Sequence, residues 1–222
     1  MSVRPVFSPS KGCAVPFDLP PPVPALEVTL SSHGMSKGIS QADGPQIFPK
    51  FSLKSGGFQA GAQWKNFSLA TAGGEAQLFA GWSGKAAGFT LAGGVAYRIL
   101  TDPRIVAGNR NSWEFNASVA RKFGPLGLRV WGLYAPDDYG LVGHSLYVEG
   151  GPSLALPDGF SVSAAVGRRD RRSAADYTSF NAGVNKTVAK KMTLDLRYYD
   201  TDRHELGYVY AARLVGSVKV AF

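Results

Sequence analysis

Apolar and polar residues alternate along most of this chain. In the closing stretch RLVGSVKVAF, every second residue from Leu214 to Phe222 is apolar or small. Arg213, Ser217 and Lys219 alternate with them, and only Val215 and Ala221 break the pattern. A period of two is typical of a β-strand with one face toward an apolar environment and the other toward a polar one. Twelve such segments follow one another, and they predict an all-β fold. They run through Leu26–Leu30, Ile47–Leu53, Phe58–Trp64, Ala76–Trp82, Phe89–Tyr97, Trp113–Val119, Leu126–Tyr134, Leu146–Val148, Phe160–Val166, Phe180–Val188, Met192–Tyr198 and Arg213–Phe222.

The connections between these segments alternate between short and long. The short ones are 55–57, 84–88, 124–125, 157–159 and 189–191, and the long ones lie near 40–46, 66–74, 100–112, 135–143, 170–176 and 200–207. This pattern, with strands of about 9–11 residues, is typical of outer-membrane barrels. We therefore predict one up-and-down antiparallel transmembrane β-barrel of about 12 strands over residues 26–222, closed by pairing of the last strand with the first.

Aromatic residues stand where the predicted strands meet turns or loops. Amphipathic rings prefer the level of the membrane–water interface. We expect two aromatic girdles from Phe58, Trp64, Trp82, Phe89, Tyr97, Trp113, Tyr134, Phe160, Phe180, Tyr198, Tyr210 and Phe222.

The polar face of the predicted strands supplies the candidate site. If the apolar face meets lipid, the polar face lines the lumen, where cations outnumber carboxylates. Two interpretations stay open: a paired network that fills and stiffens the barrel, or a narrow channel with a mild preference for anions. The candidate lumen or pore-lining residues are Glu27, Lys50, Lys65, Glu75, Glu114, Arg129, Glu149, Arg169, Asp195, Arg197, Arg213 and Lys219.

The formal net charge is +8, and most of it is spread singly along the chain. The exception is the run Arg168–Arg172, at the long-loop end of a strand. Such a run is often only solvated, but arginine forks match phosphate oxygens. We expect Arg168, Arg171 and Arg172 to contact surface lipopolysaccharide. No aromatic residues are interleaved there, which argues against nucleic acid as a partner.

The first 25 residues differ from the rest. They hold seven of the fourteen prolines and show no period. Proline at this density favours an extended arm, so we expect residues 1–25 to be a flexible N-terminal arm with no role assigned. The arm has no apolar core of a secretory signal, and the single cysteine, Cys13, cannot form an internal disulfide. The chain has no apolar run long enough for a transmembrane helix.

Catalysis is the rival class of function. His144 follows Asp137 and Asp138, and His204 stands among acidic residues, but no catalytic or phosphate-binding motif is present. The three histidines lack metal-ligand spacing. We expect no enzyme, no metal and no cofactor, and keep an outer-membrane hydrolase as the third alternative.

Three stretches resemble a known family. HGMSKGISQADGPQI, from His33 to Ile47, is similar to the first strand and loop of a proteobacterial family of predicted porins, conserved outer-membrane barrels of undetermined function. LYVEGGPSLALPDGFSVSAAVG is similar to that family's strand–turn–strand with a Leu-Pro-Asp-Gly turn, and RYYDTD to the end of its penultimate strand. Matching residues in the first stretch are Gly38, Ser40, Gln41, Asp43 and Pro45; Lys37 stands where arginine is usual. The resemblance implies an outer-membrane location and a channel role, and no substrate comes with it.

The function expected from the sequence is passive diffusion of small polar or anionic solutes across the bacterial outer membrane. The alternative is a structural or surface-interaction barrel whose lumen is filled by side chains. The expected partners are membrane lipid, lipopolysaccharide and small solutes. A homo-oligomer or a larger membrane complex stays open.

Overall fold

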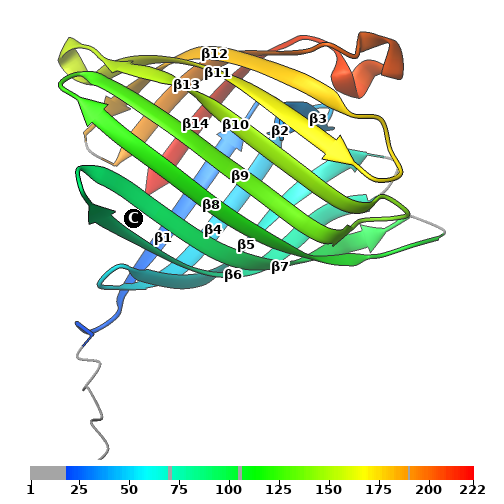
Figure 1. Cartoon of the computed structure of the whole chain (residues 1–222), viewed down its shortest axis with the longest axis horizontal. Helices are drawn as coiled ribbons and strands as arrows, with labels where there is room; N and C mark the ends of the chain where they lie inside the picture. Colours follow the sequence, from blue (N-terminus) through cyan, green and yellow to red (C-terminus); the bar gives the residue numbers. More distant parts are fainter. Residues whose placement is uncertain (1–18, 70–71, 105–106, 190) are drawn as a thin grey trace, which may run out of the picture.

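A closed antiparallel barrel forms the body of the protein (Figure 1). The computed structural model describes residues 19–69, 72–104, 107–189 and 191–222. Over these residues twelve strands join in chain order, which confirms the predicted fold. They are β1 (Val23–Ser31), β4 (Gln46–Ser55), β5 (Phe58–Leu69), β6 (Ala72–Ala86), β7 (Phe89–Pro103), β8 (Asn111–Phe123), β9 (Leu126–Asp138), β10 (Gly143–Ala155), β11 (Phe160–Arg171), β12 (Tyr177–Val188), β13 (Met192–Thr201) and β14 (Arg213–Ala221).

The last strand closes the barrel on the first. β1 pairs with β14 from Glu27 opposite Ala221 to Ser31 opposite Ser217, and β1 pairs with β4 on its other side. The amide of Phe222 also donates to the carbonyl of Leu26, at 2.9 Å. Closure removes the free edges that an open sheet would present to lipid, where unpaired amides and carbonyls are costly.

The two faces of the wall have opposite character. Large apolar side chains remain exposed on the outside, with Leu30 at 53% and Leu214 at 61% exposure, whereas Glu75 and Arg98 inside are 1% and 4% exposed. This arrangement is the reverse of that of a soluble protein, in which exposed apolar surface is limited. An apolar belt around a polar interior is what a barrel in a lipid bilayer requires.

Tight turns occupy one end of the barrel. Gly56, Gly88, Gly124 and Gly159 have positive φ angles there, which glycine adopts without steric cost. The turn η1 (Pro157–Gly159) belongs to this set, and the chain ends at the same side of the molecule as these turns (Figure 1). At the other end, η2 (His204–Leu206) and η3 (Tyr208–Tyr210) shape the connection from β13 to β14. None of the helical turns in the described part of the chain has the length or apolar character to cross a membrane.

Two expectations differ from the structure in detail. β1 begins at Val23, three residues before the Leu26 start that we predict, and residues 1–18 of the expected arm, with Cys13, lie outside the described residues. The long loop expected at 66–74 is wrong, because β5 runs to Leu69 and β6 starts at Ala72. Polar residues such as Asn66 are typical of loops, which is why the sequence predicts one here. In the structure the Asn66 side chain accepts from the Ile47 amide and donates to the Pro45 carbonyl, and strand pairing continues past it.

Tyr210 is the one expected girdle residue that the structure buries on the inner side. It is 9% exposed and packs edge-on against Tyr177, with ring centroids 5.4 Å apart. Its hydroxyl accepts from Arg171 and its carbonyl accepts from the Thr201 hydroxyl. The girdle assignment of Tyr210 is therefore wrong, because the turn η3 folds the ring back over the barrel mouth.

The inner and outer faces predict opposite behaviour of two tryptophans. Trp113 is 51% exposed on the outside, whereas the Trp131 indole nitrogen donates to Glu149 inside. Two variants, each with only one of these tryptophans, report on the rings separately. In vesicles of brominated lipid, we expect strong fluorescence quenching for Trp113 and little for Trp131. Strong quenching of Trp131 with little quenching of Trp113 would contradict the assignment of the two faces.

Candidate functional site

A small hairpin lies within the mouth of the barrel at its long-loop end. It consists of β2 (Gly34–Ser36) and β3 (Ile39–Ala42), which, among the described residues, pair only with each other (Figure 1). In the chain, the hairpin follows β1 and precedes β4. The Tyr177 hydroxyl donates to the Lys37 carbonyl at 2.7 Å, and the Lys65 ammonium donates to Gln41 Oε1 at 2.8 Å. These bonds from β12 and β5 hold the hairpin from two sides of the wall.

Gly38 allows the hairpin to approach the wall. Its φ angle is +81°, and a Cβ added there would lie 2.1 Å from the Cβ of Ser179. Any larger residue would push the hairpin away from β12. The stretch SKGISQ, which carries the family resemblance, therefore encodes the tight tip and the buried side chains of this hairpin, including Ser40, which is 1% exposed.

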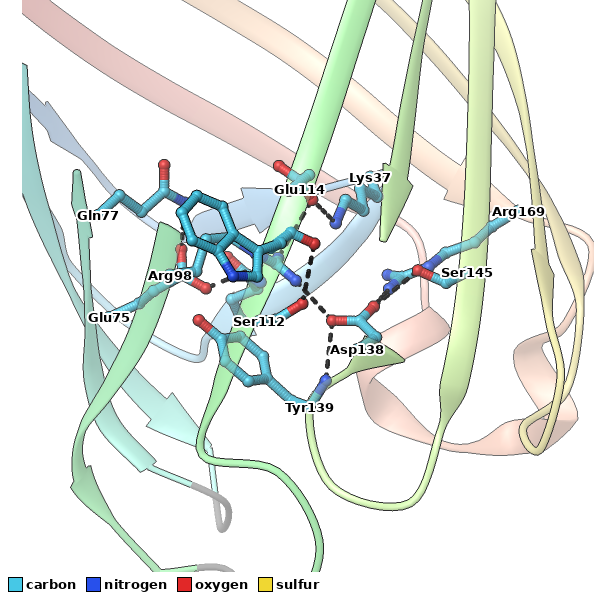
Figure 2. Close-up of polar contacts among 12 residues, drawn as sticks. Lys37, Glu75, Gln77, Arg98, Ser112, Glu114, Asp138, Tyr139, Ser145 and Arg169 are labelled. Atoms are coloured by element: carbon cyan, nitrogen blue, oxygen red, sulfur yellow. Dashed lines mark hydrogen bonds and ion pairs between the residues drawn. The ribbon is translucent and has the colours of Figure 1, made fainter. Parts of the chain in front are cut away.

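A network of ion pairs surrounds the hairpin tip (Figure 2). Lys37 pairs with Glu114, and Arg98 on β7 contacts Glu114 at 3.2 Å and Asp138 at 2.5 Å. Arg169 on β11 reaches the second oxygen of Asp138 at 2.7 Å. Lys65 contacts Glu75 at 3.2 Å, and Arg98 lies 3.8 Å from the other Glu75 oxygen. Residues from β5, β6, β7, β8, β9 and β11 are thus tied to the hairpin.

Neutral groups complete the network. The Ser145 hydroxyl and the Tyr139 amide donate to Asp138 at 2.7 and 2.9 Å, and Gln77 donates to Glu75 at 2.6 Å. The Arg98 guanidinium lies over the Tyr139 ring, 4.6 Å from its centroid. Charges removed from water need such partners, because burial of an unpaired ion is costly.

Two adjoining cavities lie beyond the hairpin. The first, of about 420 Å³, is bounded by the hairpin residues Met35 to Gly38 and by Lys65, Tyr147 and Tyr199. The second, of about 260 Å³, extends along the wall past Arg129, Ser153 and Ser163. The two share the lining residues Trp131, Glu149, Asn181 and Arg197. Polar and charged side chains therefore border both adjoining cavities inside the barrel.

The twelve candidate lumen residues fall into three groups. Lys65, Glu75, Glu114 and Arg169 belong to the ion-pair network. Arg129, Glu149 and Arg197 line the cavities, and Asp195 pairs with Arg197 at 3.1 Å. Glu27, Lys50, Lys219 and Arg213 stand on other parts of the wall: Glu27 pairs in register with Lys50, Lys219 pairs in register with Thr29, and Arg213 lies 3.8 Å from Asp43.

Sequence reasoning missed the centre of the network. Arg98 stands between the outward residues Tyr97 and Ile99, so the strand period alone places it inside the barrel. In the sequence Asp138 stands out only as a residue near His144, yet its carboxylate binds Arg98, Arg169 and Ser145. No periodic signal marks Lys37, because the hairpin folds back into the barrel through tertiary contacts.

The arginine run is divided between the two faces. Arg168 is 48% exposed and pairs with Asp170 at 3.0 Å and with Asp176 at 3.5 Å. Arg171 turns inward, where it lies over the Tyr177 ring and hydrogen-bonds to the Ala175 carbonyl and to Tyr210. Arg171 is therefore already occupied, and only Arg168 and Arg172 stay exposed.

The histidines form no recognisable catalytic group. His204 lies 2.5 Å from Asp200 on the exposed rim, and His33 lies 4.0 Å from Asp43. Within the described ranges, no three histidine, cysteine or acidic residues gather in a way that could hold a metal ion.

Comparison with solved structures gives the same barrel. The KdgM porin matches with a TM-score of 0.61 at 9% identity, over 89% of this chain and 99% of that one. The NanC porin matches with a TM-score of 0.62 at 11% identity, over 89% and 98%. An outer-membrane channel from Pseudomonas putida F1 matches with a TM-score of 0.55 at 14% identity, over 98% and 100%. At these identities the likeness shows the fold, which is that of bacterial outer-membrane barrels.

Comparison of sequences identifies the family. No curated protein sequence matches this chain. The model of a family described as "Bacterial protein of unknown function (Gcw_chp)" matches residues 20–222, which include the hairpin, the ion-pair network and every strand of the barrel. The chain therefore belongs to the Gcw_chp family of bacterial proteins.

Proposed function

We propose that this protein is a channel of the bacterial outer membrane through which small polar and anionic solutes diffuse passively. The observation that carries the proposal is the polar space beyond the hairpin, together with the inward cations Lys50, Arg129 and Lys219, of which Arg129 lines that space. The apolar outer belt and the shared fold with outer-membrane porins support the location.

The charges differ between the two parts of the lumen. Around the hairpin, each cation of the network lies against a carboxylate. Among the other candidate lumen residues in the described ranges, three cations have no ion-pair partner: Lys50, Arg129 and Lys219. Only two carboxylates of this group, Glu27 and Glu149, likewise have none. Lys50 and Arg129 instead lie over the rings of Phe79 and Trp131. The excess of positive charge favours anions in a narrow pore.

A solved porin of the same fold supports an acidic solute for this protein. The KdgM porin has been solved in complex with disordered oligogalacturonate, an acidic sugar chain. We extend only the class of solute, a small hydrophilic anion, to this protein. The exposed Arg168 and Arg172 remain our proposed contacts for lipopolysaccharide phosphates.

The runner-up is a structural barrel whose lumen is closed. The hairpin and its ion pairs favour this alternative, because they fill the long-loop end of the lumen. Ion conduction separates the two, since a closed barrel passes no current.

The channel proposal predicts stepwise currents in planar bilayers, with a reversal potential that favours chloride over potassium in a salt gradient. The double variant K50Q/K219Q removes two inward positive charges, so we expect the chloride preference to fall toward unity or reverse. R121Q is the matched control, because the Arg121 guanidinium lies over Phe89 and Phe123 near a tight turn. Absence of current steps at any voltage would leave the structural barrel as the better proposal.

The network predicts that Arg98 stabilises the mouth. In R98M, the buried carboxylates of Glu114 and Asp138 lose their shared cation, and we expect the free energy of unfolding to fall by about 3–5 kcal/mol. Urea unfolding in lipid vesicles, followed by tryptophan fluorescence, measures this. R104M is the control: Arg104 pairs with Asp102 on the exposed rim, and we expect a loss below about 1 kcal/mol. Equal losses in both variants would contradict a stabilising role of the network.

The hairpin predicts a pH effect on selectivity. Burial, and next the nearby Arg98 guanidinium, lower the pKa of Lys37 to about 8, whereas Glu114 opposes this shift. Lys37 is therefore charged below about pH 8 and neutral above it, so the chloride preference should fall as the pH rises from 7 to 9. K37R, which stays charged, should keep its preference over this range. A fall in K37R as large as that in the native protein would assign the effect to another group.

A further inference from the structure

Two opposite charges line the same cavity without pairing with each other. Arg129 on β9 and Glu149 on β10 both border the 260 Å³ cavity. Among the described residues, no ion pair within 4.0 Å joins either of them to a partner of opposite charge. Unpaired charges of both signs in one cavity differ from the ion-pair network at the mouth, in which every cation has its carboxylate.

Trp131 contacts both charged residues. The Arg129 guanidinium lies over the Trp131 ring, 5.5 Å from its centroid, and the indole Nε1 donates to Glu149 Oε1 at 2.9 Å. Trp131 stands directly opposite Glu149 in the strand register, and Arg129 stands opposite Gly151. Arg129 and Glu149 are therefore diagonal neighbours, a relation that separates the residues by about 7–8 Å.

Neutral donors hold Glu149 in place. Tyr147 and Asn181 donate to its second oxygen at 2.8 and 3.1 Å. These bonds orient the carboxylate, and no ion pair within 4.0 Å joins it to a cation among the described residues. The other cation of the cavity, Arg197, is already engaged by Asp195, Asn181 and Ser163.

We propose that Arg129 and Glu149 form a binding subsite for a small zwitterion of the α-amino acid type. The Arg129 fork would hold the carboxylate, and Glu149 would accept hydrogen bonds from the ammonium group. A simple anion would bind Arg129 but be repelled by Glu149. A simple cation would bind Glu149 but be repelled by Arg129. Because both residues line the same cavity and stand diagonally across two paired strands, one molecule in that cavity can contact both of them. The adjoining 420 Å³ cavity gives space for a side chain.

This inference rests on the proposed channel and names a solute class for it. The test uses the full chain in planar bilayers with three solutes of similar size at neutral pH: alanine, propionate and ethylammonium. We expect alanine to interrupt the ion current at about tenfold lower concentration than the other two, because it alone forms both charge-assisted contacts.

Two variants and one control assign the effect to the subsite. R129Q and E149Q should each raise the alanine concentration needed for interruption by about tenfold, because each removes one charged contact. R121Q is the matched control: Arg121 lies over Phe89 and Phe123 near a tight turn, outside the lining of this cavity, and its loss should leave the alanine effect unchanged. Equal effects of the three solutes would overturn the inference. So would a propionate effect that R129Q abolishes and E149Q leaves intact, because that result describes a plain anion site.

A binding measurement separates failure of the subsite from failure of the channel. If the native protein conducts no ions, the channel proposal fails, and saturation-transfer NMR of alanine with the protein in detergent micelles still tests the subsite. A signal for alanine that weakens in R129Q and in E149Q, but not in R121Q, supports the subsite. Its absence in the native protein overturns it.

Discussion

The whole structure depends on one requirement: a wall in lipid must satisfy its own backbone hydrogen bonds. Strand β14 meets this requirement by pairing with β1, so that no edge remains between them. Closure also determines which way the side chains point, because alternate residues must face lipid and lumen. The exposed Leu30 and Leu214 and the buried Glu75 and Arg98 are consequences of the same geometry.

A barrel of twelve strands encloses more space than eight-stranded barrels, whose lumen side chains alone can fill. In this protein an additional hairpin and a set of ion pairs occupy the long-loop end. The hairpin needs Gly38 to approach Ser179 and needs Tyr177 to hold its backbone. The ion pairs need one another, because each buried charge would be costly alone. The mouth is thus a cooperative unit whose parts come from many strands.

The rest of the lumen follows a different principle. Beyond the hairpin, Arg129 and Glu149 are held in place by an aromatic ring and by neutral donors rather than by opposite charges. Such charges remain available to a solute, whereas those of Arg98 and Asp138 are already neutralised by each other. Paired charges therefore stabilise the mouth, and the unpaired charges beyond the hairpin are the basis of the proposed solute binding.

The sequence by itself determined the class of fold. The period of two, the alternation of short and long connections and the aromatic residues at strand ends depend on local geometry, so they can be read without coordinates. The same period placed Lys65, Glu75, Glu114 and Arg169 on one face, and would have placed Arg98 there as well. The resemblance of the stretch from His33 to Ile47 also pointed to the family that the comparison of sequences shows.

Only the tertiary structure decided which of these polar residues meet. The hairpin with Lys37, the inward turn of Tyr210 and the partners of Asp138 depend on contacts between segments far apart in the chain, and no local period encodes them. The separation of Arg129 from Glu149 likewise depends on strand register and on the position of one indole ring. Local patterns specify the direction of a side chain, whereas its partner is determined by how the strands close around the lumen.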